Sequence, residues 1–190
     1  MRLPPLPPHS LSSEQQRLYH DITEVVDKSF GGLVARGPGG ALLGPFNPWL
    51  HFPQFGTPAW AFNKSLWDFR VLPEAVHQMV ILITVAKFGA RYAIDGHEYF
   101  ARRAGLSDDK ISAVAAGERP ADLTDDERVA YDVAAALNRG GVLPESTYRA
   151  ATARFGEQGV AEIVFLVGCF SMVAVTLNAF DAALPSLREA

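Results

Sequence analysis

His97 is the residue of this chain whose type and surroundings best suit acid–base chemistry. It lies within residues 72–105, close in sequence to Tyr92, Asp95 and Glu98. An imidazole can serve as a general base, a general acid or a hydrogen-bond donor near neutral pH. We therefore expect His97 to be the reactive group of a small-molecule site. The alternative, a purely structural histidine on an apolar helix, stays open at this point.

The neighbours of His97 on a helix determine whether its imidazole carries a charge. Residues three or four positions away share its face, and these are Ala93, Ile94, Phe100 and Ala101. At this spacing Asp95 and Glu98 point to other faces, so we expect His97 to be neutral near pH 7 unless one of these carboxylates turns inward.

Two predicted helices position His97. They run from Pro73 to about Phe88 and from Ala90 to about Ala104, with Gly89 between them and Gly105 after the second. Proline in the first turn and glycine just past the end are typical of helix boundaries. A helical hairpin over residues 72–105 is expected to carry the site.

The rest of the chain also has helical patterns. Apolar spacing and capping residues predict helices over 13–29, 107–117, 124–138, 144–155 and 159–182, and a short helical turn over 47–51. The aromatic residues of 53–69 are expected to be core. No alternating apolar–polar run of strand length occurs. The predicted fold class is all-α, a compact bundle of seven to eight helices.

Composition indicates an ordinary globular protein. The chain has 190 residues, 48% hydrophobic and 20% charged, with a net charge of −4. We expect a single domain over 1–190, with residues 1–11 as an extended N-terminal strap. The charge and the lack of a basic cluster argue against nucleic-acid binding. The glycine-rich segment 31–48 is expected to lie over its own or a neighbouring subunit.

The last long apolar stretch, residues 163–179, bears on localisation and assembly. It contains polar residues and falls short of the roughly 20 residues of a membrane span. We expect no membrane association and a soluble, cytoplasmic protein. A helix that is apolar on all sides must be enclosed, which favours a homo-oligomer. Cys169, the single cysteine, is expected to be a buried and inert thiol.

Several segments together resemble a known family. They are PFNPWL, LP before a long apolar helix, RYAIDGH, ARRAGLSDDKISAV and TLNAF. Their order resembles the carboxymuconolactone decarboxylase-like family, which includes the alkyl hydroperoxidase D group. The resemblance implies a compact helical fold that forms trimers or hexamers, with a pocket beside the histidine-bearing helix. It also implies either disulfide-based peroxide reduction or decarboxylation of a muconolactone.

Departures from the family pattern distinguish these two activities. Counting back from His97, the two cysteine positions fall on Ala93 and Ala90, and the glutamate position falls on Gln78. Peroxide reduction needs a thiolate and a resolving thiol, so this activity is not expected through that motif. The decarboxylase-like branch often has carboxylates at positions 78 and 93, and both are missing here.

The predicted site combines the resemblance with the residues present. The expected catalytic residues are His97, Tyr92 and Gln78, and the expected substrate-binding residues are Phe46, Asn47, Trp49, His77, Arg91 and Phe100. His51 is a further candidate, and Arg36 and Arg91 are the cations near these segments. His51, His77 and His97 lack the spacing of a metal site, so no metal and no cofactor is expected.

The sequence is consistent with two functions. The first is a decarboxylase-like enzyme that acts on a small cyclic or aromatic-derived organic acid by histidine acid–base chemistry. The second is a non-catalytic, degenerate family member that binds a small molecule.

Overall fold

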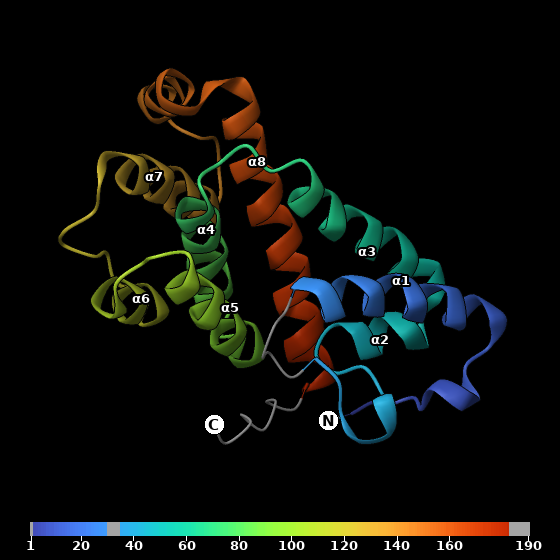
Figure 1. The fold of residues 1–190 in the computed structure, drawn as a ribbon. Helices are drawn as coiled ribbons and strands as arrows, with labels where there is room; N and C mark the ends of the chain where they lie inside the picture. The colour runs from blue at the N-terminus through green and yellow to red at the C-terminus, as the bar shows by residue number, and fades with distance from the viewer. Residues whose placement is uncertain (1, 30–34, 183–190) are drawn as a thin grey trace. The chain divides into compact units, whose positions relative to one another are not determined.

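The protein is all-α in a computed structural model that describes residues 2–29 and 35–182 (Figure 1). Its α-helices are α1 (Ser13–Ser29), α2 (Phe46–His51), α3 (Pro53–Asp68), α4 (Glu74–Lys87), α5 (Arg91–Arg103), α6 (Asp108–Ala115), α7 (Asp125–Arg139) and α8 (Glu145–Phe180). Two short 3-10 helices cover Pro8–Ser10 and Pro38–Gly40. Within the described ranges there is no strand, only an isolated bridge between Arg36 and Leu42. The predicted fold class is confirmed.

Local sequence signals set several helix ends. The Ser12 hydroxyl accepts a hydrogen bond from the Gln15 amide, and the Gln15 side chain accepts one from the Ser12 amide. Thr124 and Glu127 form the same reciprocal capping box at the start of α7. Each box satisfies two amide groups that the first helical turn leaves without partners.

Helix α8 is broken at Gly156, whose backbone angles are φ 69° and ψ 175°. Residues with a Cβ atom rarely adopt this conformation, so glycine is the residue that fits it. The two helices predicted over 144–155 and 159–182 are therefore the two segments of α8. The first glycine after Phe155 separates them, as the sequence indicates.

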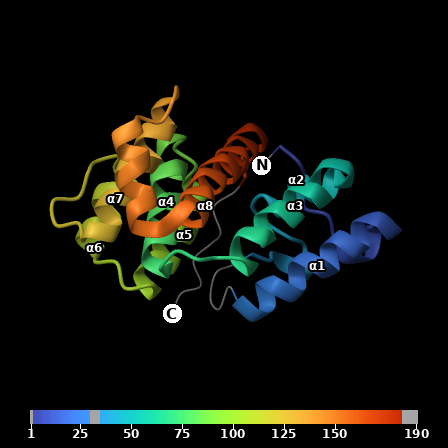
Figure 2. The ribbon, with the colours of Figure 1, turned by 90° about the horizontal axis from the view of Figure 1, so that it is seen from above.

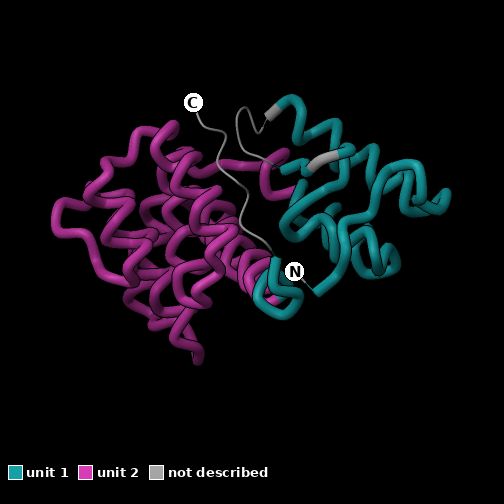
Figure 3. Tube along the Cα trace, turned by 90° about the horizontal axis from the view of Figure 1, so that it is seen from below, with its two compact units in different colours: residues 1–64, 176–190 teal, residues 65–175 magenta. Residues whose placement is uncertain are grey.

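The chain divides into two compact units, residues 1–64 with 176–190 and residues 65–175 (Figure 3). The single-domain organisation expected for 1–190 stays a prediction. The first unit contains α1 and α2, and the second contains α4 to α7 with most of α8.

In the first unit, Asn47 holds the N-terminal segment. Its side-chain amide donates to the carbonyl oxygens of Leu3 and Pro4, and its Oδ1 accepts from the Leu6 amide. Residues 2–7 contain no helix. The strap predicted over residues 1–11 is therefore fixed by a buried asparagine where the structure describes it.

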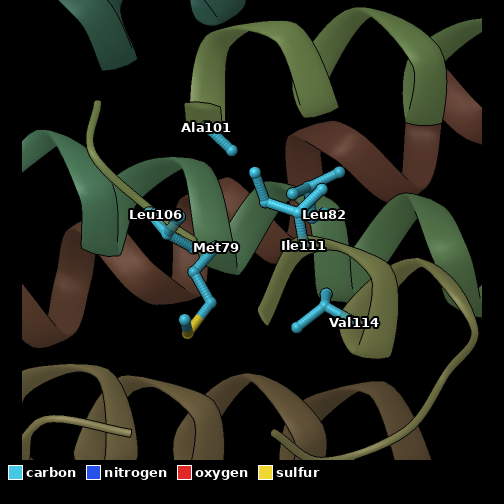
Figure 4. Packing of buried hydrophobic residues seen from close by; sticks show 6 residues of the cluster. All are labelled: Met79, Leu82, Ala101, Leu106, Ile111 and Val114. Carbon is cyan, nitrogen blue, oxygen red and sulfur yellow. The ribbon is translucent and has the colours of Figure 1, made fainter. Parts of the chain in front are cut away.

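In the second unit, α4 packs against α5, α6 and α7 (Figure 2). A hydrophobic cluster on these helices includes Met79, Leu82, Ala101, Leu106, Ile111 and Val114 (Figure 4). Nine of the fourteen residues of α4 are buried, so this helix forms the centre of the unit. Three of its buried residues, His77, Gln78 and Thr84, are polar.

The aromatic residues of 53–69 are not all core, and that prediction is wrong in part. Trp60 is 4% exposed, whereas Phe55 and Phe69 are 71% and 80% exposed. Phe55, Phe62 and Phe69 are seven positions apart and form one stripe. Trp60 lies five positions after Phe55, about 140° away around the helix. Helical spacing identifies these stripes but does not say which one meets the core.

Helix α8 is long and apolar enough to cross a membrane by length and composition, with a mean hydropathy of 2.3 over its most apolar window. The core helix of a soluble protein passes the same test, and 56% of that window is buried here. This finding is weak evidence for a membrane span. Cys169 lies on this helix and is buried, as expected.

Candidate functional site

The imidazole of His97 on α5 is hydrogen-bonded to the side chain of Gln78 on α4. Nδ1 of His97 lies 2.9 Å from Oε1 of Gln78. A carbonyl oxygen only accepts, so Nδ1 is the protonated nitrogen. Nε2 of His97 then carries the lone pair and is the nitrogen available to a ligand.

Aromatic rings surround this imidazole. The ring of Phe170 meets it edge-on at 4.9 Å between centroids, and that of Phe100 lies at 5.7 Å. Burial lowers the pKa of His97 to about 3, and positive charge on His77 lowers it further. His97 is therefore neutral at pH 7, as the sequence predicts.

A second imidazole, that of His77, is paired with a carboxylate. Nδ1 of His77 donates to Oε1 of Glu162 on α8 at 2.7 Å, and both side chains are buried. Oε2 of Glu162 accepts from the backbone amides of Val71 at 2.7 Å and Leu72 at 2.9 Å. Three donors thus satisfy one carboxylate.

The hydrogen bonds to Glu162 keep it ionised. Burial opposes ionisation, but the bonds from His77 and from the two backbone amides outweigh it and lower the pKa of Glu162. The sequence analysis missed this residue. Its signal was a single carboxylate in the apolar segment of α8, because a charge is rarely buried without a partner.

The two histidine pairs belong to one region of the second unit. The ring of Trp67 lies 4.9 Å from that of His77 and 6.4 Å from that of Phe100, which in turn contacts His97. The charge of His77 also acts on His97. The fold therefore brings together His77, Gln78, His97 and Phe100 from the predicted set.

Two buried polar atoms in this region have no hydrogen-bond partner. Among the described residues there are five such side-chain atoms, and Nε2 of His77 and Nε2 of Gln78 are two of them. An unsatisfied buried donor or acceptor costs about 1–3 kcal/mol. Two such groups on consecutive residues make this region a candidate ligand-binding site.

Tyr92 and Arg91, the other predicted site residues of the second unit, lie on the first turn of α5. Tyr92 is buried, and burial raises the pKa of its phenol. Arg91 is exposed. Their roles with a substrate stay predictions.

The predicted residues Phe46, Asn47 and Trp49 lie in the first unit on α2. Phe46 contacts the rings of Trp49 and Trp60 in edge-to-face geometry, and Asn47 holds the N-terminal segment. His51 on the same helix donates from Nε2 to the Pro4 carbonyl at 2.9 Å. All four residues therefore have structural contacts. That Phe46, Asn47 and Trp49 contact a substrate stays a prediction.

The family's cysteine positions hold methyl groups. Ala90 and Ala93 are both buried, and Cys169, which forms no disulfide, is buried on α8. No pair of sulfur atoms is available for a disulfide cycle at this site. Within the described part of the chain, no three His, Cys, Asp or Glu side chains are grouped so as to hold a metal ion.

A separate pocket of about 220 Å³ lies among α4, α6 and α7. Its walls include Lys87, Glu118, Tyr131 and Arg139. None of the predicted site residues lines it.

The helical arrangement is that of the alkylhydroperoxidase AhpD fold, which confirms the fold that the resemblance implies. One similar structure is the AhpD core of an uncharacterized peroxidase-related protein from Ralstonia eutropha JMP134. Its TM-score is 0.73 at 17% identity, over 97% of this chain and 92% of that one.

The debrominase Bmp8 has the same fold. Its apo structure matches with a TM-score of 0.70 at 15% identity, over 93% of this chain and 91% of that one. A cysteine-to-alanine variant in complex with 2,3,4-tribromopyrrole matches with a TM-score of 0.71 at 15% identity, over 98% and 93%. No family model matches this chain, and no curated protein matches it.

Proposed function

We propose that this protein is a cofactor-independent enzyme of the carboxymuconolactone decarboxylase type. Its substrate would be a small cyclic or aromatic-derived organic acid, and the enzyme would work in the cytoplasm as a homo-oligomer. The observation that carries the proposal is the partly buried hydrogen bond between His97 and Gln78 beside aromatic rings. A neutral imidazole whose Nε2 carries the lone pair, flanked by aromatic rings, supports a site for a ring-shaped ligand.

The fold neighbours support a ring-shaped ligand. The debrominase Bmp8 has been captured with a small aromatic ring, 2,3,4-tribromopyrrole, on the same fold. The aromatic side chains of this chain that flank the two histidines are Trp67, Phe100 and Phe170. Of the two activities that the resemblance implies, decarboxylation is the one that needs no cysteine pair.

An acidic substrate would change the chemistry of His97. Decarboxylation leaves an electron pair on a ring carbon, and a proton must be added there. In the free protein the pKa of His97 is about 3, so its imidazole is a weak base. A substrate carboxylate beside the imidazole would raise that pKa by favouring the charged form. The site would then take part in proton transfer only when an acid is bound.

The test is turnover on defined compounds. Carboxymuconolactone and a panel of cyclic and aromatic carboxylic acids would be incubated with the protein, and release of CO₂ measured. For a compound that is consumed, His97→Ala should lower kcat/KM by about 10²-fold or more. Arg119→Ala, on the loop after α6, is a matched control that should leave the rate unchanged. Full turnover by His97→Ala would exclude His97 as the acid–base residue.

A second candidate is a non-catalytic protein that binds the same class of acid. The amide at position 78 favours it, because a glutamate there would support a protonated imidazole and glutamine does not. A binder would show a thermal shift with members of the acid panel while no product forms. CO₂ release in the same samples would favour the enzyme.

A further inference from the structure

We propose that His77, oriented by Glu162, delivers the proton to the substrate and is thus a second catalytic residue beside His97. This inference rests on the proposed function and assigns a role that the sequence did not give to either residue. Glu162 does not touch the substrate and acts as a positioning residue. Three features support this role, namely the contacts of the pair, the unpartnered Nε2 of His77 and the ring contacts through Trp67 and Phe100 to His97.

The first step concerns the carboxylate. Glu162 is a charged group enclosed in the second unit, held by three hydrogen bonds of 2.7–2.9 Å. Two of them come from backbone amides at consecutive positions, so the carboxylate has a fixed orientation. A fixed, ionised carboxylate can stabilise the positive charge that an imidazole gains with a second proton.

The second step concerns the nitrogen that reacts. Because Nδ1 of His77 donates to Glu162, the other ring nitrogen is the one left for chemistry, as in carboxylate–imidazole pairs generally. That atom, Nε2, is buried and has no partner in the protein. The neighbouring residue, Gln78, holds His97 and also has a free donor, its Nε2.

The third step concerns access. His77 is fully buried, and the partly exposed ring of Trp67 lies against it at 4.9 Å. The same ring reaches Phe100, which contacts His97. A movement of the Trp67 side chain would expose His77 next to the aromatic surroundings of His97, so one ring-shaped ligand can meet both imidazoles.

The two imidazoles then have different tasks. The bond from the ring carbon to the carboxylate breaks, CO₂ leaves, and the electron pair stays on that carbon. The pair takes the proton from Nε2 of His77, and a C–H bond forms. His77 becomes neutral with Nδ1–H still donated to Glu162, and it regains a proton from solvent water. Once the acid is bound, Nε2 of His97 is protonated and donates a hydrogen bond to the substrate carboxylate.

The contact is tested first, with benzoate as the probe. In protein labelled with ¹⁵N-histidine, we expect benzoate to shift the Nε2 signals of both His77 and His97 along one binding curve. Tryptophan fluorescence should change over the same range as Trp67 moves. If His97 responds and His77 does not, the inference is overturned while the proposed function stands. If neither responds, both fail.

The role is tested with His77→Gln and Glu162→Gln. On an acid that the wild type consumes, His77→Gln should lower kcat by about 10²–10⁴-fold and change the Kd for benzoate less than threefold. Glu162→Gln, which keeps the size and an acceptor oxygen, should lower kcat by about tenfold or more and move the ¹⁵N signals of His77. Thr152→Val removes the hydroxyl oxygen of Thr152, which is also buried without a partner in this unit, and is the control for packing.

A merely structural pair would behave differently. In that case both variants would lose thermal stability yet keep the wild-type kcat at temperatures where they are folded, which would overturn the inference. If His77→Gln does not fold, the kcat and the His77 signals of Glu162→Gln decide the matter.

Discussion

Nδ1 of His97 donates a hydrogen bond of 2.9 Å to Oε1 of Gln78, and Gln78 is fully buried. A histidine is thus held by an amide at the position where the related sequence pattern has a carboxylate. The imidazole keeps its orientation but loses the negative charge that would stabilise its protonated form. Burial lowers the pKa of His97, and no carboxylate at position 78 counteracts it, which leads to the first prediction.

Gln78→Glu should raise the pKa of His97. Burial sets that pKa at about 3 in the wild type, and a carboxylate at hydrogen-bond distance favours the imidazolium. A ¹⁵N NMR titration of His97 measures the change. Asn138→Asp introduces a carboxylate on α7 beside Thr84 and is the matched control, with no comparable rise expected. An unchanged titration in Gln78→Glu would contradict the observed contact.

The stability of the protein should fall as the pH drops from about 6.5 towards 3. Over this window His97 is protonated in the unfolded chain but neutral in the folded one, so protons favour unfolding. The expected loss from this residue is about 1.4 kcal/mol per pH unit. The free energy of unfolding, measured with denaturant between pH 6.5 and 4.5, shows this loss. The pKa values of Glu162 and Glu127 are lowered in the folded protein, so their contributions to stability are lost mainly at lower pH.

His97→Asn should flatten this pH dependence. The amide cannot be protonated in either state, so the slope between pH 6.5 and 4.5 should decrease by the contribution of one group. His20→Asn, at an exposed position of α1, is the control. Equal slopes in the wild type and His97→Asn would show that the pKa of His97 is not lowered by folding.

Removal of the Glu162 charge should destabilise the second unit. Glu162→Gln retains an acceptor but weakens three hydrogen bonds, and we expect a loss of about 1–3 kcal/mol. Glu162→Ala leaves His77 and two amides without a partner and should cost about 3–5 kcal/mol. Chemical denaturation ranks the two variants. Glu157→Gln, on an exposed turn of the same helix, should have almost no effect.

Gly156→Ala should destabilise the protein by about 1–3 kcal/mol. A Cβ atom at this position would meet nothing within 4 Å, so the whole cost comes from the backbone angles of φ 69° and ψ 175°. Gly168→Ala is an informative comparison, because that residue is helical and its Cβ would also meet nothing. It should stabilise α8 by about 0.5–1 kcal/mol. Thermal melts of both variants test this opposite sign.

Cys169 should take no part in peroxide chemistry. Its thiol is buried, and the two family cysteine positions are alanines. Wild type and Cys169→Ser should therefore consume hydrogen peroxide at the same background rate, and the thiol should react slowly with a disulfide reagent in the folded state. Peroxide consumption that disappears in Cys169→Ser would reverse this conclusion.

The sequence by itself determined the helices of this protein and their ends. Capping residues such as Ser12 and Thr124 and the break at Gly156 act within a few residues, so each could be identified from its neighbours in the chain. The contact between Gln78 and His97 could also be anticipated, because the resemblance pairs these two positions in one helical hairpin.

Only the tertiary structure decided what lies against those helices. His77 and Glu162 are 85 positions apart, and the packing of α8 against α4 brings them together. The exposure of Phe55 and Trp60 on α3 was also decided by the tertiary structure. Both are aromatic, but Phe55 is exposed and Trp60 is buried. Helical periodicity determines which residues share one face of a helix. Which other segment packs against that face depends on contacts between residues far apart in the sequence.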